Sequence, residues 1–186
     1  MDEFKADIEE IRRRARTKIE EGAVTEAYRA DKGKVVEVLN EVLATEIVCT
    51  LRYKNHYFMA QGIHSQAIAE EFLEHAIEEQ RHADLVAKRI TELGGNPNLD
   101  PAGLNTRSHA EYKACDKLED MIREDLIAER IAISTYAEIV RWLGADDPTT
   151  RRVIEEILAK EEEHADDLAK LLVQIGAKPN GNGKRS

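Results

Sequence analysis

Apolar residues recur every three or four positions over four long stretches, and this spacing predicts four amphipathic helices. The stretches cover residues 34–61, 66–93, 111–143 and 148–175. A shorter stretch with the same spacing, residues 2–20, predicts an extra helix at the N-terminus. Only four prolines interrupt the chain, so the pattern predicts an all-α protein.

The connections between the four long helices differ in length. Residues 62–65 and 144–147 make short turns, so each of them joins two antiparallel helices. Residues 95–110 are long enough to cross the height of a bundle. We therefore expect an antiparallel four-helix bundle with a long crossover between its second and third helices. The expected divisions are an N-terminal helix and loop, the bundle and a disordered tail: residues 1–33, 34–176 and 177–186.

Glutamates and histidines interrupt the apolar stripes of the four helices, twice in the same order. The first set is Glu46 and Tyr53 on one helix, followed by Glu79 and His82 on the next. A buried Glu is costly without a partner, so these side chains are predicted to face one another. The same residue types recur 82 or 83 positions later: Glu129, Tyr136, Glu161 and His164.

This repeated pattern has the chemistry of a two-metal site. A Glu-x-x-His pair places both side chains on one helix face, one turn apart. Two such pairs plus one Glu from each of two other helices give six ligands, as in di-iron and di-manganese carboxylate bundles. The carboxylates offset the cation charge, and the imidazoles favour iron over calcium or magnesium. One Glu-x-x-His would carry little weight, but two matched copies favour metal over six polar groups that merely satisfy one another.

Composition and charge argue against several classes of protein for this chain. With 186 residues the chain is most simply one domain, and a net charge of −10 argues against extensive phosphate binding. Its apolar runs are too short to cross a membrane, and the N-terminus has no signal-peptide pattern, so we expect a cytoplasmic protein. Two cysteines are too few for a disulfide framework.

Two segments resemble bacterioferritin-type proteins of the ferritin-like superfamily. Leu39–Glu46 resembles the first helix of that family and Leu118–Glu129 its third, and the likeness extends over about residues 34–175. The resemblance implies two iron ions per subunit, with Glu79 and Glu161 as bridges, although manganese or zinc could take their place in vitro. The implied iron ligands, which would also be the catalytic residues, are Glu46, Glu79, His82, Glu129, Glu161 and His164.

The chain also departs from the bacterioferritin pattern. Gln80 stands where those proteins have a haem-binding Met, so we expect no haem of that kind. Members of the family usually have an acidic residue directly before each Glu-x-x-His, where it orients the opposite His. This chain has Glu78 at one of these positions and Lys160 at the other, so the partner of one His is left undetermined. After Ile175 we expect no fifth helix. The chain therefore resembles the Dps-like mini-ferritins, some of them called thioferritins, and we expect a homo-oligomeric shell of twelve subunits rather than 24.

Five further residues could surround the metals. Tyr53 and Tyr136 either hydrogen-bond a ligand or donate an electron, or else are ordinary core residues. His75 is an extra ligand, part of an iron route or a hydrogen-bonded core residue. Asp125 lies on the inward stripe of the third helix. Cys49 is interpreted as a small core residue in preference to a redox group.

Cys115 is the second cysteine. On a regular third helix it would lie roughly 20 Å from Glu129 along the axis, which disfavours a disulfide with Cys49. His56, His64 and His109 fall near turns or off the stripes and receive no role.

Three functions are compatible with the pattern. The first is oxidation of Fe(II) by O₂ or H₂O₂ at a ferroxidase centre, followed by storage of Fe(III) in the shell. The second is a rubrerythrin-type peroxidase or oxidase without storage. The third, DNA protection, rests on Arg12–Arg16 and on Lys184 and Arg185, and the net negative charge disfavours it.

Overall fold

The computed structural model describes residues 5–60 and 65–176, and every regular element in them is helical. Four long helices and three short ones follow one another along the chain. Their bounds are α1 Ile8–Arg14, the 3₁₀ helix η1 Ile19–Glu21, α2 Lys32–Met59, α3 Gln66–Glu92, α4 Leu104–Arg107, α5 Leu118–Leu143 and α6 Pro148–Gly176.

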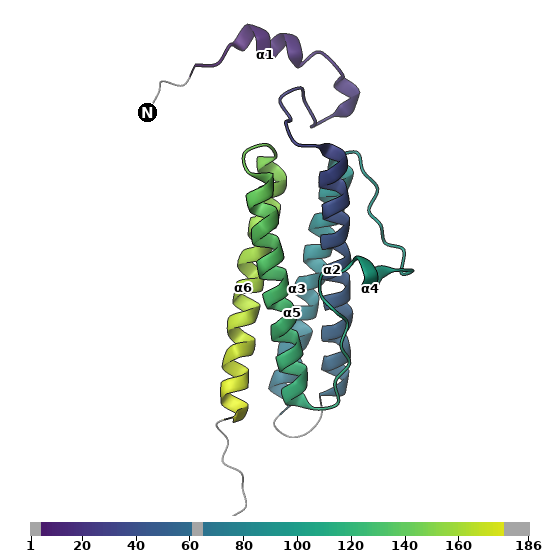
Figure 1. Cartoon of the computed structure of the whole chain (residues 1–186), viewed down its shortest axis with the longest axis vertical. Coiled ribbons are helices and arrows are strands. Elements are labelled where there is room, and N and C mark those ends of the chain that lie inside the picture. Colours follow the sequence, from purple (N-terminus) through teal and green to yellow (C-terminus); the bar gives the residue numbers. More distant parts are fainter. Residues whose placement is uncertain (1–4, 61–64, 177–186) are drawn as a thin grey trace, which may run out of the picture.

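Helices α2, α3, α5 and α6 form one bundle (Figure 1). α2 packs mainly on α3, and α5 mainly on α6. Between α3 and α5 the chain runs along the outside of α2, from one end of the bundle to the other, and α4 in this segment contacts α2 (Figure 1). The expected bundle with a long crossover is therefore confirmed. α1 lies beyond the end at which α2 begins (Figure 1).

Local signals set the helix ends. Asp31 caps α2 by accepting a hydrogen bond from the Lys34 amide, and Asp147 caps α6 in the same way through the Thr150 amide at 2.9 Å. Gly94 follows α3 with a φ of 74°, a left-handed conformation that a glycine adopts without strain. The predicted turn between α2 and α3 lies mostly outside the described residues.

The prediction for the third helix was wrong at its start. α5 begins at Leu118, seven residues after the expected position 111, so the long connection is longer than predicted. Two buried side chains of α2 bind the backbone of the intervening segment. Arg52 donates to the carbonyl of Glu111 at 3.0 Å. A ring nitrogen of His56 lies 3.0 Å from the carbonyl oxygen of Lys113. These tertiary bonds use carbonyls that a helix would need for itself.

The N-terminal helix is also shorter than predicted. Of the expected range, α1 covers Ile8–Arg14 and η1 begins at Ile19, and neither buries a residue. The Thr17 hydroxyl donates to the carbonyl of Arg14 and Lys18 has a positive φ of 47°, so the chain leaves the helix between them. Residues 1–4 and the predicted tail lie outside the described residues.

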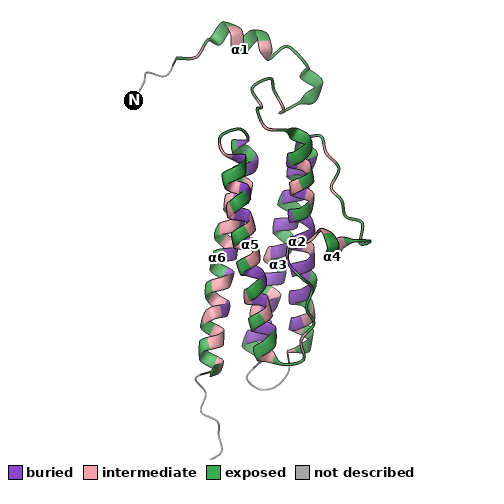
Figure 2. Ribbon diagram, viewed as in Figure 1, coloured by how far each residue is buried: buried purple, intermediate pink, exposed green. Residues whose placement is uncertain are grey.

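The bundle interior contains two large apolar clusters with polar side chains between them. One cluster surrounds Leu39, Val86 and Ile154, and the other surrounds Phe72 and Ile122. Buried residues face inward along all four long helices (Figure 2). No helix in the described parts of the chain is both long enough and apolar enough to span a membrane.

Candidate metal centre

The six predicted ligands meet in the interior of the bundle. Each of its four helices supplies at least one of them, and every one is at most 7% exposed. They are Glu46 on α2, Glu79 and His82 on α3, Glu129 on α5, and Glu161 and His164 on α6.

These side chains form two overlapping groups of four. Glu46 and His82 belong to one group and Glu129 and His164 to the other, while Glu79 and Glu161 belong to both. Within each group, one ligand atom from each residue lies within 4.8 Å of the others. Two adjacent cations could therefore each take an imidazole and a terminal carboxylate, with the two shared carboxylates between them.

Several buried atoms of the centre have no hydrogen-bond partner among the described residues. They include Oε1 of Glu79, both carboxylate oxygens of Glu161 and Nδ1 of His164, although each lies at an ion-pair distance of 3.0–3.4 Å from another atom of the centre. Buried polar atoms in folded proteins almost always have partners, so these atoms leave a place for cations. Four carboxylates and two imidazoles fit two divalent transition-metal ions in charge and in donor type.

Without cations, protons would compensate the buried charge. Burial and the nearby Glu79 raise the pKa of Glu46 well above its usual value. Burial lowers the pKa of His164, but its contacts with Glu161 and Glu79 outweigh this and raise it to about 11. The cluster therefore holds protons at neutral pH, and metal binding would release them.

The two predicted tyrosines contact ligands. The Tyr53 hydroxyl donates to Oε1 of Glu129, and the Tyr136 hydroxyl donates to Oε1 of Glu46. Burial, with these carboxylates, raises the pKa of both phenols, so each stays protonated and remains a donor. Each tyrosine thus fixes the orientation of a terminal carboxylate, as outer-shell partners of metal ligands do.

The two imidazoles differ on the side that faces away from the centre. Nε2 of His164 lies 2.7 Å from Oε2 of Glu78, which can hold this ring in place. Lys160, at the equivalent position for His82, offers no carboxylate, and its ammonium lies 3.5 Å from Glu78 instead. A cavity of about 530 Å³ borders His82, with Leu85 and Lys160 in its lining. The two predicted imidazole ligands therefore differ in their surroundings, because a carboxylate lies behind His164 and none is supplied by the equivalent position behind His82.

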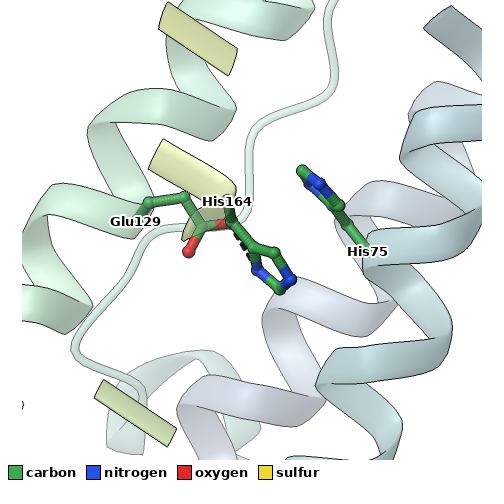
Figure 3. Close-up of side chains that lie close together, drawn as sticks. All are labelled: His75, Glu129 and His164. Atoms are coloured by element: carbon green, nitrogen blue, oxygen red, sulfur yellow. Dashed lines mark ion pairs between the residues drawn. The ribbon is translucent and has the colours of Figure 1, made fainter. Parts of the chain in front are cut away.

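His75 lies against the centre without belonging to either group of four. Its ring stacks on His164 with the ring centroids 4.0 Å apart, and it meets the ring of Tyr53 edge-on at 5.2 Å. Figure 3 shows His75 and Glu129 approaching His164 from different helices. Burial lowers the pKa of His75 to about 4, so this imidazole is neutral at pH 7.

Asp125 does not contact the ligands but belongs to a separate buried network. Its carboxylate lies 2.8 Å from Nε of Arg52 and 2.8 Å from Nδ1 of His56. All three residues are at most 1% exposed. The prediction that His56 lies near a turn or off the inward stripe was wrong, since it is fully buried. Arg52 and His56 follow Cys49 by three and seven residues, and this spacing places both on its inward stripe.

The remaining candidates have modest contacts. Cys49 is buried beside Ala110 and Ala128, in agreement with a core role, and burial raises the pKa of its thiol. Cys115 precedes α5, and both thiols are free. Gln80 is exposed and its amide donates to Asp84, while the absence of haem stays a prediction.

Comparison with known families agrees with this geometry. The family model for the ferritin-like domain matches residues 36–177, which include all six predicted ligands. The chain belongs to the ferritin-like family.

Individual relatives show which kinds of ferritin-like protein this chain resembles. Bacterioferritin from Desulfovibrio desulfuricans is 32% identical over 133 residues, 72% of this chain and 71% of the relative. A solved structure of a D. desulfuricans bacterioferritin, described as having a diiron site, superposes with a TM-score of 0.70 at 26% identity and covers 78% of this chain and 81% of its own.

Two further relatives carry other names. A bacterioferritin-related protein from Bacteroides fragilis, described as a dodecameric thioferritin, superposes with a TM-score of 0.76 at 33% identity, over 80% of this chain and 89% of that one. The DNA protection during starvation protein of Pyrococcus furiosus is 30% identical over 166 residues, 83% of this chain and 84% of the relative. The expected likeness to bacterioferritins and Dps-like proteins is confirmed.

Proposed function

We propose that this protein oxidises Fe(II) with O₂ or H₂O₂ at the six-residue centre and stores the Fe(III) produced. The observation that carries the proposal is the pair of buried four-residue groups that share Glu79 and Glu161. Fe(II) is the substrate, and the cytoplasm is the expected compartment. Manganese or zinc would fit the same donors in vitro.

The arrangement of the side chains suits this reaction. Two ferrous ions held side by side can each give up one electron, so together they supply the two that reduction of O₂ to H₂O₂, or of H₂O₂ to water, requires. Four carboxylates balance the charge of two ferrous ions and offset most of the charge of the two ferric products. Tyr53 and Tyr136 hold Glu129 and Glu46 in place, and Glu78 holds His164.

Storage requires a shell, and we propose one of twelve subunits. The support is the B. fragilis relative, which is described as dodecameric. Large apolar side chains remain exposed on the single chain, among them Phe58, which is 74% exposed, and Trp142, which is 50% exposed. Subunit contacts in the proposed shell would cover side chains of this kind.

DNA protection stays the weaker proposal, although one relative carries it in its name. In the Arg12–Arg16 cluster, Arg13 pairs with Glu10 at 2.7 Å and Arg14 lies 3.4 Å from the same carboxylate. Intrachain pairing and the net charge of −10 both reduce attraction to phosphate.

Substitution of the two shared carboxylates tests the assignment. Glu79→Ala with Glu161→Ala should slow Fe(II) oxidation by more than about 100-fold, because each proposed iron loses two ligands. A matched control replaces Glu70 and Glu162, which are exposed on the same two helices. Circular dichroism should show the same helix content in both variants. Equal oxidation rates in the two variants would remove these glutamates from the mechanism.

Native mass spectrometry, before and after aerobic loading with excess Fe(II), tests storage. We expect a shell of twelve subunits that retains far more than two irons per chain. A small oligomer that stops at two irons per chain would point instead to a di-iron peroxidase or oxidase of the rubrerythrin kind.

A further inference from the structure

A second group of potential ligands lies beside the centre on α3 and α6. Glu71, His75 and Asp167 each offer one ligand atom, and these atoms lie within 4.8 Å of one another. The side chain of Glu71 is 32% exposed and that of Asp167 is 36% exposed, whereas His75 is buried. The group therefore reaches from the surface into the bundle.

His75 connects this group with the centre. Its Nε2 lies 3.4 Å from Oε1 of Glu71, and its ring stacks directly on that of His164 (Figure 3). His75 also forms a close group of possible ligands with Glu129 and His164. The Nδ1 atom of His75 has no hydrogen-bond partner in the described parts of the chain. Nε2 is therefore the nitrogen that faces Glu71, and Nδ1 is a separate buried atom of the same ring that lacks a partner among the described residues.

The internal repeat supplies a control within the same molecule. A shift of 82 residues, which relates Glu79 to Glu161, relates His75 to Ile157 and Glu71 to Val153. The same shift relates Asp167 to Leu85, so all three equivalents are apolar. Ile157 is fully buried in the core. The bundle therefore folds around apolar residues at these positions, and the polar group on one side is not a requirement of the fold.

We propose that Glu71, His75 and Asp167 form a third cation site, which takes up a divalent transition-metal ion from solvent and delivers it to the centre. Two carboxylates balance the charge of one such ion, and the imidazole favours iron, cobalt or zinc over calcium and magnesium. Delivery rests on the proposed ferroxidase function, but ion binding does not.

Lys170 is the competing cation at this site. Its ammonium lies 3.0 Å from Oδ1 of Asp167 and 2.6 Å from Asp166. The Lys170 side chain is 59% exposed, and an exposed ion pair of this kind contributes little to stability. A divalent ion can therefore displace the ammonium from Asp167 while Lys170 keeps Asp166 as its partner.

Cobalt binding tests the site without any redox step. Crystals soaked in Co²⁺ should show anomalous scattering between the three side chains, in addition to the centre. Glu71→Gln with Asp167→Asn should weaken binding there by at least about tenfold and leave the centre occupied. The control, Glu70→Gln with Glu162→Gln, makes the same charge change at exposed positions on the same two helices, leaves Asp166 as the partner of Lys170 and should keep all ions. Wild-type crystals without an ion at this place would overturn the proposal, as would an ion that persists in the Glu71/Asp167 variant.

Oxidation kinetics test delivery. In the Glu71/Asp167 variant, the Fe(II) concentration for half-maximal rate should rise about tenfold, with the maximal rate unchanged because the centre is intact. An unchanged Fe(II) concentration for half-maximal rate would overturn the proposed delivery of ions to the centre. The cobalt experiment would still decide whether the third site binds an ion. If wild-type protein did not oxidise Fe(II) at all, the ferroxidase proposal would fail independently of cobalt binding.

Discussion

The two ends of the bundle are built on the same repeat but have opposite character. α2 and α5 run in opposite directions, so the repeat that relates them exchanges the ends (Figure 1). Next to the centre, one end has Val42, Ile139 and Ile157, which all belong to the larger apolar cluster. This end is closed by close packing of hydrocarbon side chains.

At the other end, the equivalent positions are polar. Asp125 replaces Val42, His56 replaces Ile139 and His75 replaces Ile157, by the same shifts of 83 and 82 residues. Asp125 and His56 are fully buried and paired with each other. The repeat therefore keeps the six predicted ligands and the two tyrosines but not the residue types in the layers next to them. One of these layers is packed with apolar side chains, and the other holds buried polar contacts.

The largest expected effect comes from breaking the polar end. Arg52→Met would leave Asp125 without its guanidinium partner and free the backbone of Glu111. Loss of one partner of a buried ion pair should lower the free energy of unfolding by about 3–5 kcal/mol. Denaturant unfolding of the metal-free protein at fixed concentration measures this.

The repeat supplies the control for that variant. Thr135 is the equivalent of Arg52 and is only partly buried, so Thr135→Ala should change the free energy of unfolding by less than about 0.5 kcal/mol. Equal losses in the two variants would show that the ends do not differ in the way described.

A smaller effect should distinguish the two imidazoles. Glu78→Gln removes the carboxylate behind His164, so it should weaken cobalt binding on that side by about 10–100-fold. Lys160→Gln, at the equivalent position behind His82, removes no such partner and should leave binding nearly unchanged. Titration with Co²⁺, followed by visible absorption, measures both. A greater loss from Lys160→Gln would reverse the assignment of the outer shell.

The smallest effect concerns the cap of α6 at the apolar end. Burial raises the pKa of Asp147, but hydrogen bonds from Thr150 outweigh it and hold the pKa below its ordinary value of 3.8. A lowered pKa stabilises the fold above the unfolded value, and this contribution is lost as pH falls through the folded value. Asn can still accept at the cap, and Arg89, which donates to Asp147 at 3.1 Å, keeps Glu92 as a charged partner at 3.2 Å. Asp147→Asn should therefore cost about 1 kcal/mol at pH 7, from weaker hydrogen bonds to the neutral amide.

The same reasoning gives the pH dependence. The difference in unfolding free energy between wild type and Asp147→Asn should shrink as pH falls below about 4, where the wild-type carboxylate takes up its proton. Unfolding at several pH values measures the difference. A difference in unfolding free energy that stays constant down to pH 3 would mean that the charge of Asp147 contributes nothing to stability.

The sequence by itself determined the four long helices and the set of candidate ligands. Helical periodicity depends on local spacing, and α2, α3 and α6 begin within two residues of prediction. Glu46 and Glu79 were identifiable because a Glu on an inward stripe is too costly to bury without a purpose. The 82- and 83-residue shifts then identified their equivalents.

Only the tertiary structure decided where α5 begins and which residues surround the centre. Residues 111–117 leave the helix because Arg52 and His56, some 60 positions earlier, bind their carbonyls. Asp125 faces those two side chains rather than a ligand, although its stripe position could not distinguish the two cases. Periodicity gives the direction in which a side chain points, but its partner is set by which helices pack together, and that depends on contacts between distant parts of the chain.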